Sequence, residues 1–463
     1  MTFLRPSPHR GAHQVAETGG PWRWFARCFG VAVIAHLAGN PAGWRAEELG
    51  GSGLLVAVSA ALGASAFVVV VRPNPRVLGV TALLVLASLW LELPAAGNHW
   101  LLVGFVAVAV LVSLGTRDPW GWFSVTGRWI LLGFYSFAAF AKLNTGFLDP
   151  SVSCGVFYAN QSLTSFGLPT FGSDSILGTL AVAGPVLTEL SVPVLLAFTR
   201  TRRAGVLLAL VFHSLISLDL DQHFYDFTAA LVMLLCLFLP DDTTAALEAR
   251  AARPSRLCVI AITVAMAIVV ASLMPPVLPA VLVVRLLALV LWVPVAGWFI
   301  VAVARHGLGP AAVPMRLRGG AAWFLVAVVV ANGLTPYLEV KTALGFNMYA
   351  NLVTVAGESN HLVVRRTLHL SDVQDDLLEV VGSDAPDLAT YAEDGYLIPE
   401  RNLLDYLARH PDVSVVVRDE DGERRLDGSD GVGVPLVTSK LLAFRAVDAQ
   451  DPPRCQARWL PAR

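Results

Sequence analysis

Charged residues are scarce in this chain, and lysine is nearly absent from it. Charged side chains make up 15% of the 463 residues and the mean hydropathy is +0.63, whereas a soluble protein carries about 25% charge. Of the 33 basic residues, only Lys142, Lys341 and Lys440 are lysines. The formal net charge of −2 gives no electrostatic reason to expect a nucleic-acid partner. These shortages favour an integral membrane protein.

The first residues also lack the features of a secretory signal peptide. Residues 1–21 are rich in proline, glycine and histidine. They have no short apolar core and no small-residue cleavage site. We therefore expect this segment to be disordered and the apolar run that follows to be a retained helix.

Long apolar runs fill the chain from about residue 24 to residue 338. A membrane-spanning helix needs ~20 mostly apolar residues, and about eleven runs approach that length, with a range of eight to twelve. The runs are 24–39, 53–71, 76–94, 99–115, 128–143, 176–198, 203–218, 227–240, 257–275, 279–304 and 321–338. The predicted fold class is a polytopic α-helical membrane protein.

Arginines between these runs predict an orientation. If the N-terminus is inside, thirteen arginines fall in or beside cytoplasmic loops, Arg128 and Arg202 among them, and only Arg45 falls in an opposite loop. Cytoplasmic loops of membrane proteins carry such an excess. The asymmetry predicts a cytoplasmic N-terminus and an exterior C-terminal tail.

The tail, residues 341–463, has an ordinary soluble composition and predicts a small α+β domain. Residues 413–417 followed by the turn at 419–422 indicate a strand and a hairpin turn. Residues 399–409 indicate a helix with proline at its start. Residues 441–447 indicate another strand.

Five cysteines are present, and the predicted orientation separates them. Cys154 and Cys455 both fall on the exterior side, where disulfides form, so a bridge between them is possible and is left open here. Cys28, Cys236 and Cys258 lie in or beside apolar runs and fit the role of apolar filler.

Ionisable residues inside the runs are costly to bury and are candidates for a functional site. They are His36, Glu92, His99, Lys142, Glu189, His213 and Arg285. At 1.5 Å per residue, nearly all of them fall in the outer half of the predicted spans. A pocket there, covered by the tail domain, would explain this clustering.

Simpler interpretations remain open for each of these residues. His36 can be a packed, hydrogen-bonded histidine, and Glu189 can pair with His213. Lys142 and Arg285 can extend their charged ends to the interface. A shielded lysine, however, can lose its proton and act as a base.

An acidic loop follows the run at 203–218. Asp219, Asp221 and His223 stand at alternate positions and could hold a divalent cation. The simpler interpretation is a solvated loop between two spans, and we predict no metal site.

Four segments with polar residues follow one another in a characteristic order and spacing. They are Gly97-Asn98-His99-Trp100, Phe140-Ala141-Lys142-Leu143-Asn144, the helix from Pro185 to Pro193 that carries Glu189, and Val211-Phe212-His213-Ser214 with the aromatic stretch Phe224 to Phe238. In this order and spacing they resemble the vitamin K-dependent γ-carboxylase superfamily, in particular its bacterial HTTM (horizontally transferred transmembrane) branch.

A further block after the last run is similar to the same branch. It consists of Asn332-Gly333, Pro336-Tyr337-Leu338, Lys341-Thr342, Phe346-Asn347-Met348-Tyr349 and Asn360-His361. Where the animal carboxylases have a comparable F-S-W-x-M-M segment, this chain lacks the tryptophan and retains only Met348. The resemblance divides the chain into an HTTM-like domain at 22–240, additional spans at 241–340 and the exterior domain at 341–463.

The resemblance implies an activity and a set of site residues. Lys142, with His99 and His213, would be catalytic, and Lys142 would take a proton from a reduced vitamin K-type naphthoquinone. Reaction with O2 would then allow removal of a weakly acidic carbon proton, after which CO2 adds. Asn98, Glu189, Met348 and Arg285 would contact the quinone.

Two function classes follow from this reading. The first is a quinol-dependent, γ-carboxylase-like enzyme of a bacterial plasma membrane that acts on a peptide or small substrate. The alternative is a non-enzymatic membrane scaffold or maturation factor for an exported peptide. The expected partners are the lipid bilayer, a quinone and an exported peptide or protein.

Overall fold

A computed structural model describes residues 10–43, 53–222, 224–253, 256–274 and 278–456. The first helix, α1, begins at Arg10 and ends at Gly39. Helix α1 therefore covers residues 10–21 of the segment that we expect from the sequence to be disordered. Residues 1–9 lie outside the described part of the chain.

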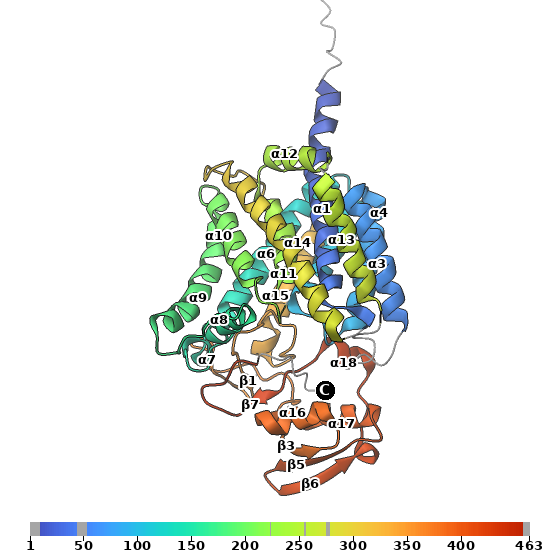
Figure 1. Ribbon diagram of the computed structural model, residues 1–463. Coiled ribbons are helices and arrows are strands. Elements are labelled where there is room, and N and C mark those ends of the chain that lie inside the picture. Colours follow the sequence, from blue (N-terminus) through green and yellow to red (C-terminus); the bar gives the residue numbers. More distant parts are fainter. Residues whose placement is uncertain (1–9, 44–52, 223, 254–255, 275–277, 457–463) are drawn as a thin grey trace, which may run out of the picture. The chain divides into compact units, whose positions relative to one another are not determined.

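The protein is mostly helical, with 63% of the chain in helices and a small sheet region near its C-terminus (Figure 1). The helices after α1 are α3 Gly53–Val71, α4 Pro75–Glu92, α5 Asn98–Leu114, α6 Pro119–Ala141, α7 Thr145–Leu148, α8 Cys154–Ser165, α9 Ile176–Ala197, α10 Arg202–Ile216, α11 Tyr225–Leu235, η1 Cys236–Phe238, α12 Asp241–Ala251, α13 Arg256–Ser272, α14 Leu278–Ala304, α15 Gly320–Leu334, η2 Thr335–Leu338, α16 Pro386–Asp394, α17 Glu400–Arg409, η3 Gly428–Asp430 and α18 Leu436–Leu441.

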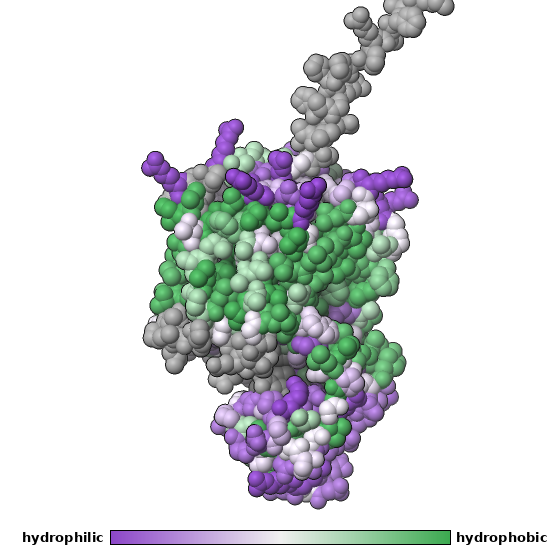
Figure 2. Space-filling view, turned by 90° about the vertical axis from the view of Figure 1, so that its right-hand side faces the viewer, coloured by the Kyte–Doolittle hydropathy of each residue, from purple (hydrophilic) through white to green (hydrophobic). Residues whose placement is uncertain are grey.

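Five helices of the described chain are long and apolar enough to cross a membrane. They are Gly53–Val71, Pro75–Glu92, Ile176–Ala197, Val283–Ala304 and Gly320–Leu338. The apolar helices Asn98–Leu114, Tyr225–Phe238 and Val259–Ser272 are shorter. Hydrophobic side chains cover the helical surface broadly on the face drawn in Figure 2, as expected for helices that could contact lipid.

The chain forms two compact units, each assembled from three stretches. Unit 1 contains Met1–Leu91, Leu102–Leu132 and Ser191–Val326. Unit 2 contains Glu92–Leu101, Gly133–Leu190 and Ala327–Arg463. Each unit therefore joins segments that are far apart in the sequence.

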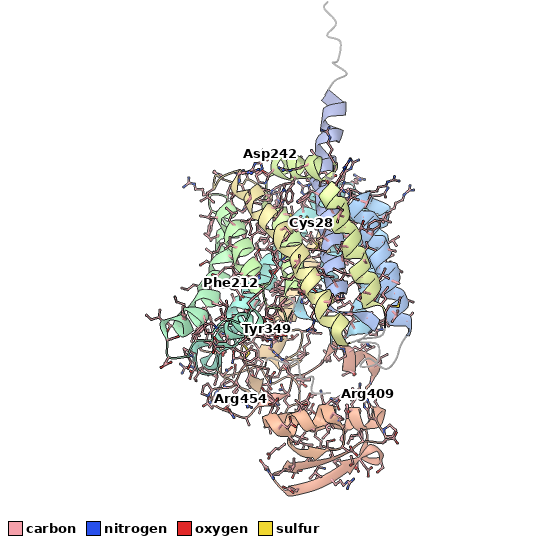
Figure 3. The ribbon with its side chains drawn as sticks, in the orientation of Figure 1. Cys28, Phe212, Asp242, Tyr349, Arg409 and Arg454 are labelled. Atoms are coloured by element: carbon pink, nitrogen blue, oxygen red, sulfur yellow. A yellow bond between two sulfur atoms is a disulfide. The ribbon has the colours of Figure 1, made fainter. Side chains whose placement is uncertain are left out.

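Helix α1 is the centre of unit 1. It packs against α3, α11, α12 and α13. The Phe25 ring of α1 is tilted by 52° against the Phe123 ring, with 4.4 Å between the ring centroids. Arg27 of the same helix forms an ion pair of 2.7 Å with Glu248 of α12. Cys28, labelled in Figure 3, lies on the same helix with its sulfur 3.7 Å from that of Cys236.

Helix α6 corrects one predicted span. It begins at Pro119, not at residue 128, because Asp118 accepts a hydrogen bond of 2.9 Å from the Gly121 N–H and proline suits the first helical turn. Arg128 is therefore a buried residue inside the helix and not a loop arginine. Its guanidinium donates to the carbonyl oxygens of Leu237, at 2.6 Å, and Pro314, at 2.7 Å.

The tail of unit 2 is an antiparallel α+β domain, as predicted. Its strands are β3 Leu377–Ser383, β4 Tyr396–Pro399, β5 Ser414–Asp419, β6 Gly422–Asp427 and β7 Val447–Asp448, in the order β6-β5-β3-β4-β7. Gly422 adopts φ 121° at the hairpin turn between β5 and β6, a backbone conformation that favours glycine. A short pair, β1 Thr354–Val355 and β2 Glu358–Ser359, precedes this sheet.

The predicted strand and helix at 413–417 and 399–409 are confirmed by β5 and α17. The predicted strand at 441–447 is wrong. Helix α18 runs to Leu441, and only Val447 of that run pairs in the sheet. The apolar stretch instead inserts Phe444 and Ala446 into the core that the sheet forms with α16 and α17, so burial, not strand pairing, explains its composition.

Candidate functional site

Lys142 and Glu189 form a buried ion pair in unit 2. Lys142 follows the end of α6, Glu189 lies in α9, and the Lys142 Nζ is 2.6 Å from Glu189 Oε2. The two residues are 6% and 8% exposed. The amine also donates to the Ala138 carbonyl at 3.3 Å and lies 5.8 Å from the centre of the Phe147 ring. The partner of Glu189 is therefore Lys142, which replaces the suggested pairing with His213.

Asn144 fixes the segment that carries this lysine. Its side-chain oxygen accepts from the Phe147 N–H at 2.8 Å and so caps α7. Its side-chain nitrogen donates to the carbonyls of Ala141, at 2.7 Å, and Ala350. Asn144 is fully buried, and its bonds join the Lys142 segment to the 346–351 block that shares the family resemblance.

Asn360 and His361 bind the same segment from the other side. Asn360 donates to the side-chain oxygen of Asn144 at 3.2 Å. His361 Nε2 lies 2.8 Å from the Phe140 carbonyl, and its Nδ1 accepts from the N–H groups of Val363 and Val364. Because Nδ1 must be an acceptor, Nε2 carries the proton and the ring is neutral. Burial correspondingly lowers the pKa of His361.

The block between the last candidate span and His361 has an unusual backbone. Six residues other than glycine adopt positive φ between 50° and 61°: Glu339, Leu344, Phe346, Tyr349, Asn351 and Ala356. Such conformations cost about 1–2 kcal/mol per residue. They persist only where the surroundings determine them and they gather at functional sites.

Asn98 and His99 lie at the start of α5, within unit 2. The Asn98 side chain accepts a hydrogen bond of 2.9 Å from the Phe346 N–H. Asn98, a predicted quinone contact, is therefore bound to the segment with positive φ angles that contains Phe346. The His99 ring occupies the space beside Gly97, where an added Cβ would lie 2.7 Å from the ring. A side chain at position 97 would therefore displace the His99 ring from its place. Met348 lies in the strained block and is partly buried.

His213 and Arg285 belong to unit 1. His213 is 1% exposed and packs edge-on against Phe212 and Phe227, at 5.0 and 5.1 Å between ring centroids. Phe212 is labelled in Figure 3. Arg285 lies in α14 and is partly buried. Their predicted catalytic and quinone-binding roles stay predictions.

A polar cluster in unit 1 contains residues that the sequence analysis missed. Asn40 donates to Asp226 at 2.8 Å and lies 3.3 Å from His36 Nδ1. His36 and Asp226 are 2% and 3% exposed. The cluster gives His36 the packed, hydrogen-bonded role considered above. The sequence feature that could have indicated this cluster is Asp226, a carboxylate at the start of an apolar helix.

The acidic loop at 219–222 is ordered by its own backbone. Asp219 Oδ1 accepts from the N–H groups of Asp221, at 2.9 Å, and Gln222, at 2.8 Å. This is a turn in which the side chain replaces a backbone acceptor. His223, the third member of the suggested cation site, lies outside the described residues.

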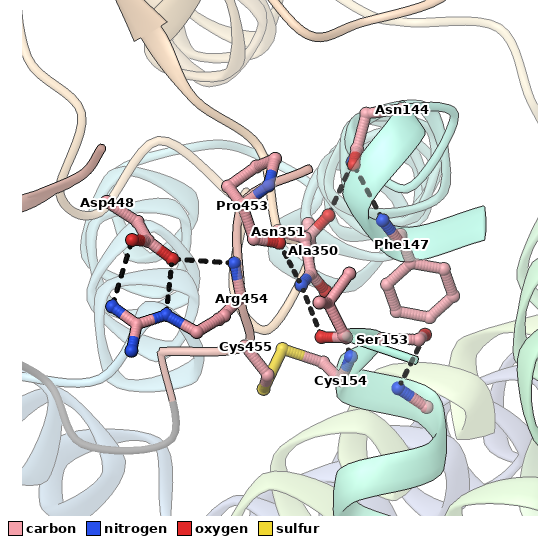
Figure 4. The surroundings of a disulfide bond; sticks show 12 residues. Asn144, Phe147, Ser153, Cys154, Ala350, Asn351, Asp448, Pro453, Arg454 and Cys455 are labelled. Atoms are coloured by element: carbon pink, nitrogen blue, oxygen red, sulfur yellow. Dashed lines mark hydrogen bonds and ion pairs between the residues drawn. A yellow bond between two sulfur atoms is a disulfide. The ribbon is translucent and has the colours of Figure 1, made fainter. Parts of the chain in front are cut away.

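A disulfide joins Cys154 and Cys455, with 4.7 Å between the Cα atoms (Figure 4). The pairing that the sequence left open is confirmed. Asn351 supports both ends, because it accepts from the Cys154 N–H at 3.0 Å and donates to the carbonyls of Val152 and Pro453. The bridge therefore fastens the end of the described chain to α8.

Comparison with known proteins gives no name to this arrangement. No protein family model, no curated protein and no solved structure matches the chain.

Proposed function

We propose that the protein is an integral membrane enzyme in which the buried Lys142–Glu189 pair transfers a proton to and from a reduced quinone. The observation that carries the proposal is the 2.6 Å contact between an amine and a carboxylate that are both buried. Such pairs are costly in an apolar region and mark proton pathways and ligand sites.

The surroundings of the pair suit a quinol hydroxyl. The Phe147 ring offers an apolar face near the amine, and water exclusion would protect reactive species. A bound reduced naphthoquinone would be oxidised by O2 in a four-electron reaction overall, with one oxygen atom entering the quinone epoxide and the other leaving as water. With a neutral amine beside the Glu189 carboxylate, Lys142 would accept the quinol proton at Nζ, and the product would be the ammonium–carboxylate ion pair seen in the structure. Asn144 and His361 would hold the Lys142 segment in place.

The substrate class that fits this chemistry carries a weakly acidic C–H bond. The basic oxygen species formed from O2 would take that proton and leave as water, and the resulting carbanion would add to CO2 to give a carboxylate. The resemblance to the γ-carboxylase superfamily supports a peptide or a small molecule as the substrate. It also supports a bacterial plasma membrane as the location.

The same proposal includes about eleven spans, a cytoplasmic N-terminus and an exterior tail. The arginine asymmetry supports it even when the buried Arg128 is left out of the count. The disulfide of unit 2 supports it as well, because such bonds persist in oxidising compartments.

Replacement of both members of the pair tests the proposal. Lys142→Met alone leaves Glu189 buried and uncompensated, which costs about 3–5 kcal/mol in known buried pairs. The double variant Lys142→Met/Glu189→Gln removes both charges, so its melting temperature should recover toward the wild-type value. Its oxygen uptake with reduced naphthoquinone should still fall by at least ~10²-fold, the scale of a lost general base.

Lys440→Met is the matched control, because Lys440 donates to the Leu93 carbonyl in unit 2 and takes no part in the pair. It should consume oxygen at the wild-type rate. If the folded double variant also consumes quinol at that rate, the pair is not the base and the scaffold alternative is favoured.

A further inference from the structure

A small cavity lies in unit 2 beside the disulfide. Its volume is about 30 Å³, and its lining includes Cys154, Tyr349, Gln374, Arg445, Asp448 and Arg454. Tyr349 and Arg454 are labelled in Figure 3. One water needs about 10–15 Å³ on this measure, so the cavity has room for two or three oxygen-sized groups.

The charges around the cavity leave one cation uncompensated. Asp448 is paired with Arg454 through two contacts of 3.0 Å, drawn in Figure 4. Arg445 has no such carboxylate within the described residue ranges. Its buried Nε has no hydrogen-bond partner among the residues that the structure describes. Burial lowers the pKa of Arg445, but a guanidinium stays charged at neutral pH. The cavity therefore has a surplus of one positive charge.

Gln374 adds a second requirement. It is 2% exposed, and its Oε1 is buried without a hydrogen-bond partner in the described part of the chain. A buried amide needs both a donor for its oxygen and an acceptor for its nitrogen. A buried polar atom left without a hydrogen-bond partner destabilises the folded chain.

We propose that this cavity, between Arg445 and Gln374, binds a small planar oxyanion that carries an O–H group, the chemistry of bicarbonate. Two oxygens of the anion accept from the guanidinium, in the geometry that arginine favours. The O–H donates to the Gln374 oxygen. One negative charge balances the surplus positive charge. Acetate and chloride also carry one negative charge that balances Arg445. Neither has an O–H group that could donate to the Gln374 oxygen. The site does not depend on the chemistry of Lys142.

Calorimetric titration of the full chain in mild detergent tests the site, with sodium bicarbonate as the probe at constant pH and ionic strength. Acetate and chloride are titrated in parallel. We expect saturable binding that is stronger for bicarbonate than for either comparison anion. Arg445→Gln should weaken bicarbonate binding at least about tenfold, the scale for lost charge-assisted hydrogen bonds.

Two further variants separate binding from folding. Arg401→Gln removes an equal charge from an exposed position of the same domain and should bind bicarbonate normally. Arg445→Lys keeps the charge without the two parallel N–H groups, so it should melt normally and bind more weakly. Gln374→Leu should abolish the preference for bicarbonate over acetate. Absence of saturation, equal binding of chloride, or unchanged binding by both Arg445 variants would overturn the proposal.

Discussion

Two histidines of unit 2 illustrate how the surroundings of a single residue set its protonation. His361 accepts two backbone N–H bonds at Nδ1, so the structure keeps it neutral. His369 lies between two carboxylates: its Nδ1 contacts Glu339, and its Nε2 is 3.0 Å from Asp375. Its pKa is raised, chiefly by the hydrogen bond to Glu339. The surroundings therefore favour the neutral form of His361 and the protonated form of His369.

Opposite pH dependences follow for the stability of unit 2. Because the pKa of His361 is lowered in the folded state, the unfolded chain binds a proton at this histidine more readily. The contribution of His361 to folding stability is therefore lost as pH drops below about 6.5. The raised pKa of His369 gives a contribution that is complete below about 6.5 and is lost as pH rises through the folded-state value.

Melting temperatures measured from pH 5 to 9 would test both signs. Relative to wild type, His369→Gln should lose stability on the acidic side of the range and little on the alkaline side. His361→Gln should lose stability mainly above about pH 6.5, where the native histidine is neutral in both states. Parallel curves for a variant and wild type would contradict the role given to that histidine.

At the scale of elements, two buried arginines hold an irregular segment of unit 1. Arg202 donates to the carbonyl of Leu196 at 2.7 Å, at the end of α9, and to that of Ala311 at 2.8 Å. Arg128 donates to Pro314. The last carbonyls of a helix have no partner within it, so these side chains replace the missing donors.

Arg202→Met should destabilise unit 1, because it leaves these buried carbonyls without donors. A cost on the order of 1–3 kcal/mol per unsatisfied group is expected. Thermal unfolding in detergent would measure it. Arg200→Met removes the same charge two residues earlier, at an exposed position, and should change the melting temperature little. Equal losses for the two variants would show that charge, not carbonyl capping, is responsible.

The sequence predicted elements better than it predicted their partners. The run at 53–71 matches α3, and the turn before Gly422 was recognised, because apolar length and turn chemistry are local signals. The partner of Glu189 was not predictable, since Lys142 lies on another helix and only packing brings the two together. The contact of His361 with Phe140 joins segments 221 positions apart. The motif residues were therefore visible in sequence, but their assembly was not.

At the scale of the whole molecule, orientation in a membrane is the property with the widest consequences. Unit 2 holds the disulfide, the Lys142–Glu189 pair and the small cavity. If the tail faces the exterior, these features lie on or open toward the oxidising side. Among the cysteines whose side chains the structure describes, Cys28 and Cys236 are free, and both lie in unit 1.

Labelling of single cysteines in intact cells would test the orientation. The background is a chain in which Cys28, Cys236 and Cys258 are replaced by serine, while Cys154 and Cys455 are kept because their disulfide does not react with thiol reagents. Asp421→Cys places a probe in the exposed hairpin turn of the tail, and His306→Cys places one in the exposed loop after α14. An impermeant maleimide should label Asp421→Cys in intact cells. It should label His306→Cys only after permeabilisation, since the arginine asymmetry predicts that the loop after α14 is cytoplasmic. The reverse labelling pattern would show that the chain has the opposite orientation in the membrane. The disulfide would then face a reducing compartment, where such bonds rarely persist, and the exterior site proposed for the enzyme would have to be abandoned.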